Sequence, residues 1–396
     1  MLKRKTKKLS SKKSTKKSRS KKATKKPLKK KVVSKKRSRT KSKKLKALHL
    51  HRAMRNPIMR PTAGSYWESE AVFNPGAVIH GGRVHLFYRA LGPDGVSRVG
   101  YASSKDGIHF DKRSSHPVYM PETVRESERH YSHTSPARLK YDKALYASGG
   151  GWGGCEDPRS VKIDDRIYLT FNIFNGWNSI RVGLTSINER DLENGRWNWR
   201  RLVFLSPPNE RHKCWVLFPE KIEGKYALLH SVYDNDPSLV QVEYLDSLEE
   251  PIPYIKSSDP HLLPDRNLAW HNRTRGAGPP PVKTRYGWLL FYHAMDRNDP
   301  NRYKLGVMLL DSKDPRKVLY RSNYPILEPD EWYENDWKPG IIYASGAVVK
   351  GDTLLIYYGG GDKHIGVAYT NLDNFVKKLM KNEHVSLSVK STRVVS

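Results

Sequence analysis

The chain has 396 residues, with 72 Lys and Arg against 40 Asp and Glu, for a formal net charge of +32. The excess is concentrated in residues 1–46, which hold 25 Lys or Arg and no acidic residue; removing those 25 from 72 leaves 47 basic against 40 acidic residues. No run approaches the roughly 18 apolar residues of a membrane span, and no apolar segment of a secretory signal follows the basic start.

Residues 1–48 form a Lys-rich segment with few apolar side chains. It cannot bury enough surface to offset the entropy lost on ordering, so we expect a disordered tail. Two interpretations stay open: an arm that binds nucleic acid or another polyanion, or a solubilising extension without a partner. The two cysteines, Cys155 and Cys214, fit a reducing compartment. With no secretory signal, we predict an intracellular protein, cytoplasmic or nuclear.

Residues 49–380 alternate short aromatic and β-branched runs with Gly, Pro, Asn and Asp, a pattern typical of strands and turns. Five runs align without gaps, at 83–89, 166–172, 225–231, 287–293 and 353–359. A second strand follows each, at 99–102, 182–185, 239–242, 305–308 and 365–368, and only the third copy lacks a glycine. This repeat of roughly 60–65 residues predicts an all-β fold, a five-bladed β-propeller with an insertion at about 111–150.

The two ends of this domain carry weaker signals. Residues 56–61 (NPIMRP) resemble residues 324–329 (YPILEP), so we expect the start of the chain to supply a strand to the last blade. Residues 374–380 carry a short helical pattern, and residues 381–396 are expected to be a loose basic extension.

Polar residues close most of the aligned runs, where they could line a central funnel suited to a sugar: Arg89, Asn172, Ser231, His293 and Gly359. Aromatic rings could supply apolar faces for pyranose rings: Trp67, Trp152, Trp177, Trp215, Trp270 and Tyr292. Each ring taken singly is more often part of a core than a ligand platform.

A glycine-rich loop at 149–154 leads to Glu156 and Asp157, with Pro158 and Arg159 after them and a predicted strand from residue 160. Glycine lets the backbone approach a ligand closely, so the loop predicts an acid held in a site. The alternative is a turn aspartate capped by Arg159. The loop lacks the Gly-Lys-Ser/Thr ending of a phosphate loop. The 15 histidines include no cluster with metal-ligand spacing, so no metal is predicted.

Short motifs lie along about 55–378: 56–61 (NPIMRP), 67–75 (WESEAVFNP), 86–89 (LFYR), 154–159 (GCEDPR), 216–222 (VLFPEKI), 276–281 (GAGPPP), 325–329 (PILEP) and 358–362 (YGGGD). In sequence and in order they resemble those of the family 130 glycoside hydrolases and phosphorylases, which act on β-mannosides. The resemblance implies a five-bladed propeller, in agreement with the repeat.

The resemblance also implies roles. Asp157 is the expected general acid, which protonates the glycosidic oxygen through the 3-hydroxyl of the mannosyl residue with inversion at C1. In the phosphorylases inorganic phosphate attacks C1 and α-mannose 1-phosphate leaves, so phosphate is a co-substrate and no cofactor is expected. The implied substrate-binding residues are Asn74, Arg89, Glu156, Arg159 and Asp362. The implied phosphate-binding residues are Lys213, Tyr292 and His293.

One departure concerns the phosphate site. Several family phosphorylases carry an Arg-Asn pair where residues 176–178 read Gly-Trp-Asn, and Arg181 or Arg275 could substitute. The related β-mannosidases use a carboxylate base instead, and Glu68 and Glu220 match acids common to the family. We favour phosphorolysis of β-mannoside oligosaccharides. Two alternatives stay open: hydrolysis of the same linkage, and a non-catalytic mannoside-binding propeller with a polyanion-binding tail. The oligomeric state is not predicted.

Overall fold

Strands dominate the computed structural model, which describes residues 48–120, 151, 153–175, 180–234, 236, 238–249, 252–257, 270–296, 298–381 and 385–388. These residues belong to one unit, Leu45–Ser396. Residues 1–47 of the predicted tail lie outside the described residues, and so does most of the predicted insertion. Among the described residues, no helix has the length and apolar character needed to cross a bilayer.

The strands of the described residues form four hydrogen-bonded sheets. The first contains β2 (Ala71–His80), β3 (Arg83–Leu91), β4 (Val96–Ser104), β5 (Phe110–Arg113), β6 (Gly153–Ile163), β7 (Arg166–Asn175), β8 (Ile180–Asn188) and β9 (Val203–Phe204). The second contains β10 (Val216–Leu217), β11 (Tyr226–Ser231) and β12 (Gln241–Leu245). The third contains β13 (Arg273–Ala277), β14 (Val282–Thr284), β15 (Gly287–Asp296), β16 (Asp299–Leu310) and β17 (Val318–Arg321). The fourth contains β18 (Ile342–Lys350), β19 (Thr353–Gly360), β20 (His364–Asn371), β1 (Leu48–Arg52) and β21 (Val385–Ser388).

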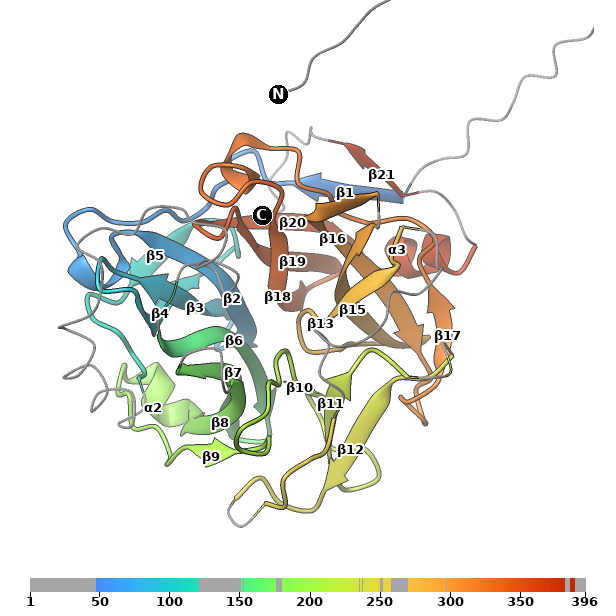
Figure 1. Cartoon of the computed structure of the whole chain (residues 1–396), viewed down its shortest axis with the longest axis horizontal. Coiled ribbons are helices and arrows are strands. Elements are labelled where there is room, and N and C mark those ends of the chain that lie inside the picture. The colour runs from blue at the N-terminus through green and yellow to red at the C-terminus, as the bar shows by residue number, and fades with distance from the viewer. Residues whose placement is uncertain are drawn as a thin grey trace, which may run out of the picture. The chain divides into compact units, whose positions relative to one another are not determined.

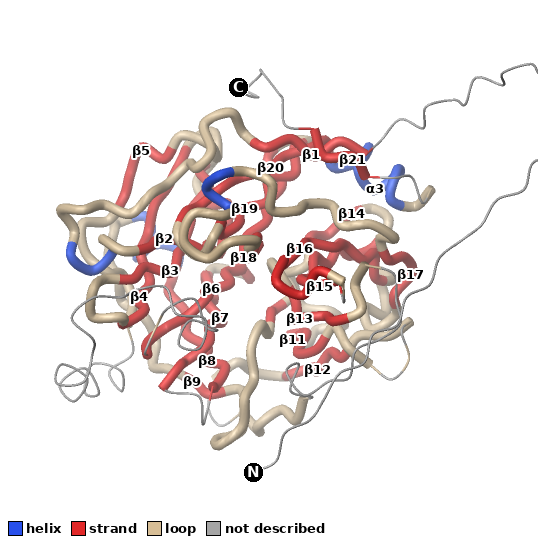
Figure 2. Tube along the Cα trace, turned by 45° about the horizontal axis from the view of Figure 1, so that its top comes forward, coloured by secondary structure: helices blue, strands red, loops and turns tan. Residues whose placement is uncertain are grey.

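Helices are short segments between the strands (Figure 2). Those of the described residues are α2 (Glu189–Glu193), α3 (Leu372–Leu379) and the 3-10 turns η1 (Tyr66–Glu68) and η2 (Trp332–Glu334). The predicted helix at 374–380 is thereby confirmed as α3, whose first turn is capped by the Asn371 side chain. Figure 1 shows β2–β5, β6–β9, β10–β12, β13–β17 and β18–β20 following one another around the middle of the view, with the first strand of each group innermost.

The repeat read from the sequence is confirmed as a series of antiparallel strand pairs. The five aligned runs are β3, β7, β11, β15 and β19, and each pairs with the next strand along the chain. The second strand of the third copy begins at Gln241 and not at Leu239. Leu239 forms an isolated bridge with Lys317 instead, which takes its backbone out of the pairing with β11.

The recurrent glycine of the second strand makes room for an aromatic ring on the strand beside it. The directly paired residues are Tyr88–Gly100, Phe171–Gly183, Tyr292–Gly306 and Tyr358–Gly366. A Cβ atom on any of these glycines would lie only 2.3 to 3.0 Å from a ring atom of its partner. The glycine in the repeat is therefore required by cross-strand packing.

The start of the chain joins the last sheet, as predicted. β1 pairs antiparallel with β20, with His51 opposite Tyr369 and Arg52 opposite Ala368. The other edge of β1 pairs in parallel with β21. The prediction of a loose end after residue 380 was wrong for residues 385–388, because an edge strand offers unpaired backbone groups that a short segment can satisfy.

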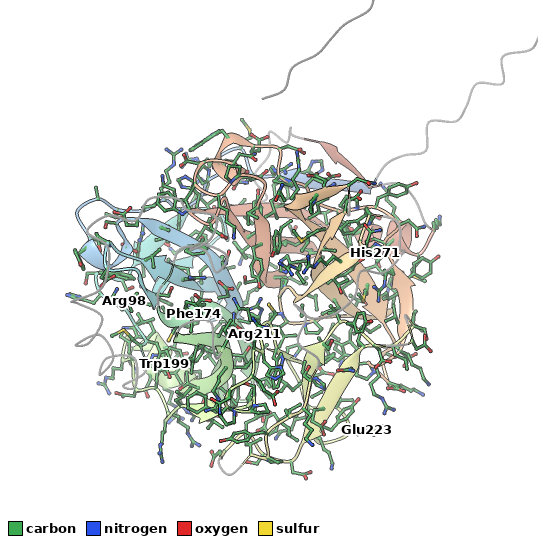
Figure 3. The ribbon with its side chains drawn as sticks, viewed as in Figure 1. Arg98, Phe174, Trp199, Arg211, Glu223 and His271 are labelled. Carbon is green, nitrogen blue, oxygen red and sulfur yellow. The ribbon has the colours of Figure 1, made fainter. Side chains whose placement is uncertain are left out.

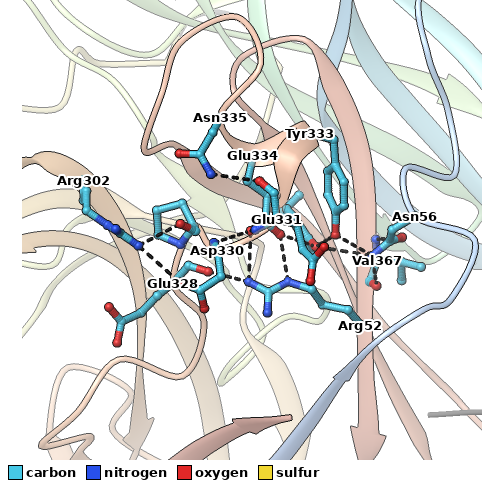
Figure 4. Close-up of polar contacts among 12 residues, drawn as sticks. Arg52, Asn56, Arg302, Glu328, Asp330, Glu331, Tyr333, Glu334, Asn335 and Val367 are labelled. Carbon is cyan, nitrogen blue, oxygen red and sulfur yellow. Dashed lines mark hydrogen bonds and ion pairs between the residues drawn. The ribbon is translucent and has the colours of Figure 1, made fainter. Parts of the chain in front are cut away.

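A buried polar network holds this junction together (Figure 4). Arg52 donates from Nε to Glu334 Oε1 at 2.8 Å and from Nη2 to Glu334 Oε2 at 3.0 Å. Tyr358 donates its hydroxyl to Glu334 Oε1 at 2.9 Å. The Asn56 side chain donates to the Val367 carbonyl and accepts from the Val367 amide, both at 3.0 Å. The first and last parts of the domain are thus joined by charge and amide contacts as well as by strand pairing.

Candidate active site

Asp157 lies within β6, at a bulge opposite β7. The register passes from Glu156 opposite Asn172 to Arg159 opposite Thr170, so Asp157 and Pro158 have no partner on β7. Asp157 has a φ of +52°. The sequence placed these acids in a loop before the strand, which was wrong, because β6 begins at Gly153 and continues through the bulge. A bulge turns a side chain away from the regular alternation and is common beside active sites.

The first sheet contains a matching bulge at Asn74. The register of β2 and β3 shifts between Phe73 and Gly76, and Asn74 has a φ of +47°. Asn74 donates from Nδ2 to Asp157 Oδ1 at 2.7 Å. The Asn74 side chain packs against Gly359, where a Cβ atom would lie only 2.0 Å from Asn74 Oδ1. Two bulges from consecutive repeats therefore meet, and the glycine that closes the fifth run leaves space for them.

Two cations face the pair of acids. Arg89 donates to Asp157 Oδ1 at 3.3 Å and to Glu156 Oε1 at 2.9 Å, and it is only 1% exposed. Lys213 Nζ lies 3.7 Å from Glu156 Oε2. Ser97 accepts from Arg89 Nε at 2.9 Å and holds the guanidinium in place. Figure 3 shows Arg211, which shortly precedes Lys213 in the chain, near the middle of the view.

Asn172 and Arg159 hold Asp157 from the other side. Asn172 Nδ2 donates to Asp157 Oδ2 at 3.4 Å. Arg159 Nη1 donates to the main-chain carbonyl of Asp157 at 2.7 Å, and its Nη2 donates to the Tyr343 hydroxyl at 2.9 Å. The His293 ring stacks on the Tyr343 ring, with centroids 4.0 Å apart and planes 9° from parallel.

These surroundings set the charge of the site. Burial raises the pKa of Asp157, but the opposing effects of Arg89, Arg159, the Asn74 hydrogen bond and Lys213 outweigh it, so the pKa lies below its ordinary value. Asp157 is therefore ionised at neutral pH without ligand. Burial, with Arg159 nearby, lowers the pKa of His293 to about 3, so this imidazole is neutral.

The structure brings together most of the residues singled out from the sequence. Those in contact with Asp157 or Glu156 are Asn74, Arg89, Arg159, Asn172 and Lys213. His293 reaches this group through Tyr343. Asp362 accepts from Lys338 at 3.0 Å. Burial opposes the charge of Arg89, but Glu156, Asp157 and then Asp362 outweigh it and raise the pKa of this guanidinium.

Tyr292 is not in this group. Neighbouring residues of a strand point to opposite faces, so Tyr292 and His293 cannot face the same space. The Tyr292 ring lies over Gly306, is 6.1 Å from the Trp270 ring and is fully buried in a hydrophobic cluster.

The other side chains considered as ligand contacts lie elsewhere. The described tryptophans among the proposed ring platforms are all part of hydrophobic clusters: Trp67, Trp215 and Trp270. Trp152 and residues 176–178 lie outside the described residues. Arg181 donates to the Ser206 carbonyl at 2.8 Å, and Arg275 donates to the Tyr303 hydroxyl at 2.9 Å.

Two residues of the site were not singled out from the sequence: Tyr343 and Cys214. Tyr343 pairs with Gly359, the residue that closes the fifth run, but this pairing cannot be read from the sequence. Cys214 has a φ of +65°, a left-handed backbone conformation that it shares with Asn74 and Asp157. In the part of the chain that the structure describes, no group of three His, Cys, Asp or Glu is placed to hold a metal ion.

Known proteins match this chain over most of its length. The profile of glycoside hydrolase family 130, described as β-1,4-mannooligosaccharide phosphorylase, matches residues 145–381. A 1,2-β-oligomannan phosphorylase of Thermoanaerobacter sp. is 38% identical, over 81% of this chain and 97% of that protein. A β-1,2-mannobiose phosphorylase of the same organism is 35% identical, over 81% and 96%. The structure of β-1,2-mannobiose phosphorylase from Listeria innocua has a similar fold, with a TM-score of 0.59 at 22% identity over 83% and 99%.

Proposed function

Since this chain belongs to glycoside hydrolase family 130, we propose that it cleaves β-mannoside oligosaccharides by phosphorolysis and releases α-mannose 1-phosphate. Asp157 is the general acid of the proposed reaction. Asn74, Arg89, Glu156, Arg159 and Asp362 bind and orient the substrate, and Lys213 and His293 lie on the phosphate side.

The observation that carries the proposal is the placement of the other carboxylates. An inverting hydrolase needs a second carboxylate to activate water, opposite the acid. Glu68 is held by the Tyr88 hydroxyl at 2.8 Å and by Arg113 at 2.7 Å. Glu220 is paired with Lys283 on the surface. Glu68 and Glu220, the two acids that the sequence offered as a hydrolase base, are thus paired with other residues, and this favours phosphate as the nucleophile.

Cations replace the second carboxylate in this mechanism. Phosphate brings its own negative charge, so the site needs donors and positive charge, which Lys213 and Arg89 supply. The bound anion offsets the charges that hold the pKa of Asp157 low, so Asp157 takes up a proton as phosphate binds. Phosphate oxygen then forms a bond to C1 while the C1–O bond to the leaving sugar breaks. The Asp157 proton passes through the mannosyl 3-hydroxyl to that leaving oxygen.

We propose a β-1,2 linkage for the substrate. The relatives that are 38% and 35% identical are both named for β-1,2-mannosides. The linkage that is cleaved depends on how the sugar next to the cleaved bond is oriented. Membership of the family therefore does not decide the linkage.

The phosphate dependence is tested by incubating the protein with β-1,2-mannobiose and β-1,4-mannobiose, each with and without phosphate. We expect α-mannose 1-phosphate from the β-1,2 disaccharide in the presence of phosphate and no turnover in its absence. Products are separated by anion-exchange chromatography. Free mannose formed at the same rate in both samples would instead identify a β-mannosidase, and turnover of the β-1,4 disaccharide alone would overturn the linkage.

The strand groups support a five-bladed propeller as the architecture. β2–β5 and β6–β9 are two blades within the 8-stranded sheet, since β4 and β6 share only two pairs, Val96–Gly153 and Ser97–Gly154. β10–β12, β13–β17 and β18–β20 with β1 are the other three. A ring of this kind explains why Asp157 of the second blade meets Asn74 of the first and, through Arg159, Tyr343 of the last.

We also propose that residues 1–48 bind a polyanion such as nucleic acid. Residues 1–46 carry 25 basic and no acidic residues, whereas the rest of the chain is nearly balanced. Such a segment neutralises phosphates and releases their counterions, which makes the affinity strongly salt-dependent. The intracellular location, cytoplasmic or nuclear, stays a prediction.

The tail is tested with a variant that lacks residues 1–46 and so spares β1. We expect it to lose salt-dependent DNA and heparin binding, measured by fluorescence anisotropy between low and high salt. Turnover of mannobiose should stay within about twofold, because the site is built from residues 74–362. Unchanged DNA affinity would leave only the solubilising role, and loss of turnover would make the tail part of the site.

A further inference from the structure

Asp157 belongs to a closed circuit of hydrogen bonds that also includes Tyr343 and Cys214, two residues to which no role has been assigned above. Arg159 donates to the Asp157 carbonyl at 2.7 Å and to the Tyr343 hydroxyl at 2.9 Å. The Tyr343 oxygen is 2.8 Å from Cys214 Sγ. The Cys214 amide donates to Asn172 Oδ1 at 3.1 Å, and Asn172 Nδ2 returns to Asp157 Oδ2 at 3.4 Å.

The chemistry of the groups gives this circuit a direction. Arginine has only donors, so the Tyr343 oxygen must accept from Arg159. Burial and the neighbouring Cys214 raise the pKa of Tyr343 well above its ordinary value, so its hydroxyl keeps a proton. That proton is free to point at Cys214 Sγ, the acceptor within reach. The Cys214 amide occupies Asn172 Oδ1, which leaves the amino group of Asn172 to face the acid.

The circuit also joins separate parts of the chain. Arg159 and Asn172 belong to β6 and β7, Tyr343 to β18, and Cys214 to the segment before β10. Arg159 is 2% exposed and donates from Nε to the Gly278 carbonyl at 3.0 Å as well. A displacement of Tyr343 therefore changes the hydrogen bonds to two oxygens of Asp157, the main-chain carbonyl that accepts from Arg159 and the Oδ2 that accepts from Asn172.

We propose that Tyr343 and Cys214 are positioning residues, which orient the Asp157 carboxyl through Arg159 and Asn172. They act without touching the reacting atoms. This inference rests on the proposed function, because the effect is read out in turnover of β-mannosides. This circuit would fix the position of the Asp157 carboxyl, because a catalytic acid must be held within a fraction of an ångström of its productive position by its neighbours.

The test is a double-mutant cycle of Tyr343→Phe and Cys214→Ala. Phenylalanine keeps the ring on which His293 stacks and removes only the hydroxyl. We expect Tyr343→Phe to lower kcat about tenfold, the size of one hydrogen bond to a charged group, because it removes the acceptor of Arg159. Cys214→Ala removes the neutral partner of the Tyr343 hydroxyl and should lower kcat less, with KM for mannobiose and phosphate within about twofold in both variants. The double variant should lose little more than Tyr343→Phe alone, because both substitutions break the same circuit.

Two further variants separate positioning from folding. Cys214→Ser keeps an acceptor for Tyr343 and should recover most of the kcat lost in Cys214→Ala. Tyr357→Phe removes another buried hydroxyl of the same sheet, which donates to the Gly107 carbonyl at 2.8 Å, away from Asp157. It should lower the unfolding midpoint and leave kcat unchanged.

The outcomes are distinguishable. Wild-type kcat in Tyr343→Phe, or fully additive losses in the double variant, would overturn the positioning role. Equal losses of kcat in Tyr343→Phe and Tyr357→Phe would show a general effect of stability and would overturn it too. If the wild-type protein turns over no β-mannoside at all, the proposed function fails first. Asn172 then still reports on the circuit, because its side-chain amide resonances should shift in Tyr343→Phe and not in Tyr357→Phe if the circuit exists.

Discussion

Replacing Asp157 by asparagine is expected to lower kcat for phosphorolysis about 10³-fold, within the range of general acid catalysis. Asparagine has nearly the same shape and tolerates the φ of +52° found at this position, so the bulge should persist. It cannot supply the proton to the leaving oxygen. Phosphate affinity, measured by calorimetry, should be unchanged or tighter, because the substitution removes one negative charge from beside Arg89.

The matched control is Asp164→Asn. Asp164 also has a left-handed backbone, with a φ of +53°, and lies in the turn between β6 and β7. Its carboxylate is 68% exposed and pairs with Lys221 at 3.4 Å. We expect wild-type kcat from this variant. If Asp157→Asn retained more than about a tenth of the wild-type kcat, general acid catalysis by Asp157 would be excluded.

Replacing Arg52 by methionine is expected to lower the free energy of unfolding by about 3–5 kcal/mol, the cost of leaving one member of a buried ion pair without its partner. The partner, Glu334, is fully buried. The Glu334 carboxylate also accepts from the amides of Asp330 and Glu331, at 2.8 and 2.9 Å, which keep it in place after Arg52 is removed. Urea unfolding followed by tryptophan fluorescence measures the change.

A second substitution tests the cause of that loss. In Arg52→Met with Glu334→Gln the buried negative charge is absent, so the double variant should be more stable than Arg52→Met alone. The control is Arg285→Met, which breaks a surface pair with Asp373 and should cost much less stability, because solvent screens an exposed ion pair. A loss at Arg52 no larger than at Arg285 would mean that the junction between β1 and β20 does not depend on this pair.

Much of the fold could be predicted because strands leave a local signature. The aligned runs and the glycine of the following strand recur because four of the five repeats pack an aromatic ring over a glycine, as in Tyr88 over Gly100. The pairing of the start of the chain with the last sheet was predicted from the similarity between residues 56–61 and residues 324–329. The pairing of β21 was missed, because four residues of ordinary composition carry no signal for the edge that they cover.

The candidate site could be predicted in part. The closing residues of the aligned runs suggested Arg89 and Asn172, and both contact Asp157. Tyr343 was missed because it lies on a first strand, β18, where the sequence shows no polar pattern. Tyr292 and His293 were treated alike because they are adjacent in sequence, whereas strand alternation sends one side chain into a core and the other onto Tyr343.

The sequence by itself determined the all-β fold, the repeat, the charge contrast between tail and body, and the acid around which the candidate site is built. These are properties of local composition and spacing. The tertiary structure decided which side chains meet Asp157 and which carboxylates are committed elsewhere. That choice depends on register shifts at residues 74 and 157 and on contacts between residues far apart in sequence, such as Arg159 and Tyr343, which are separated by 184 positions. A one-residue change of register reverses every side chain along a strand, so spacing in the sequence cannot decide it.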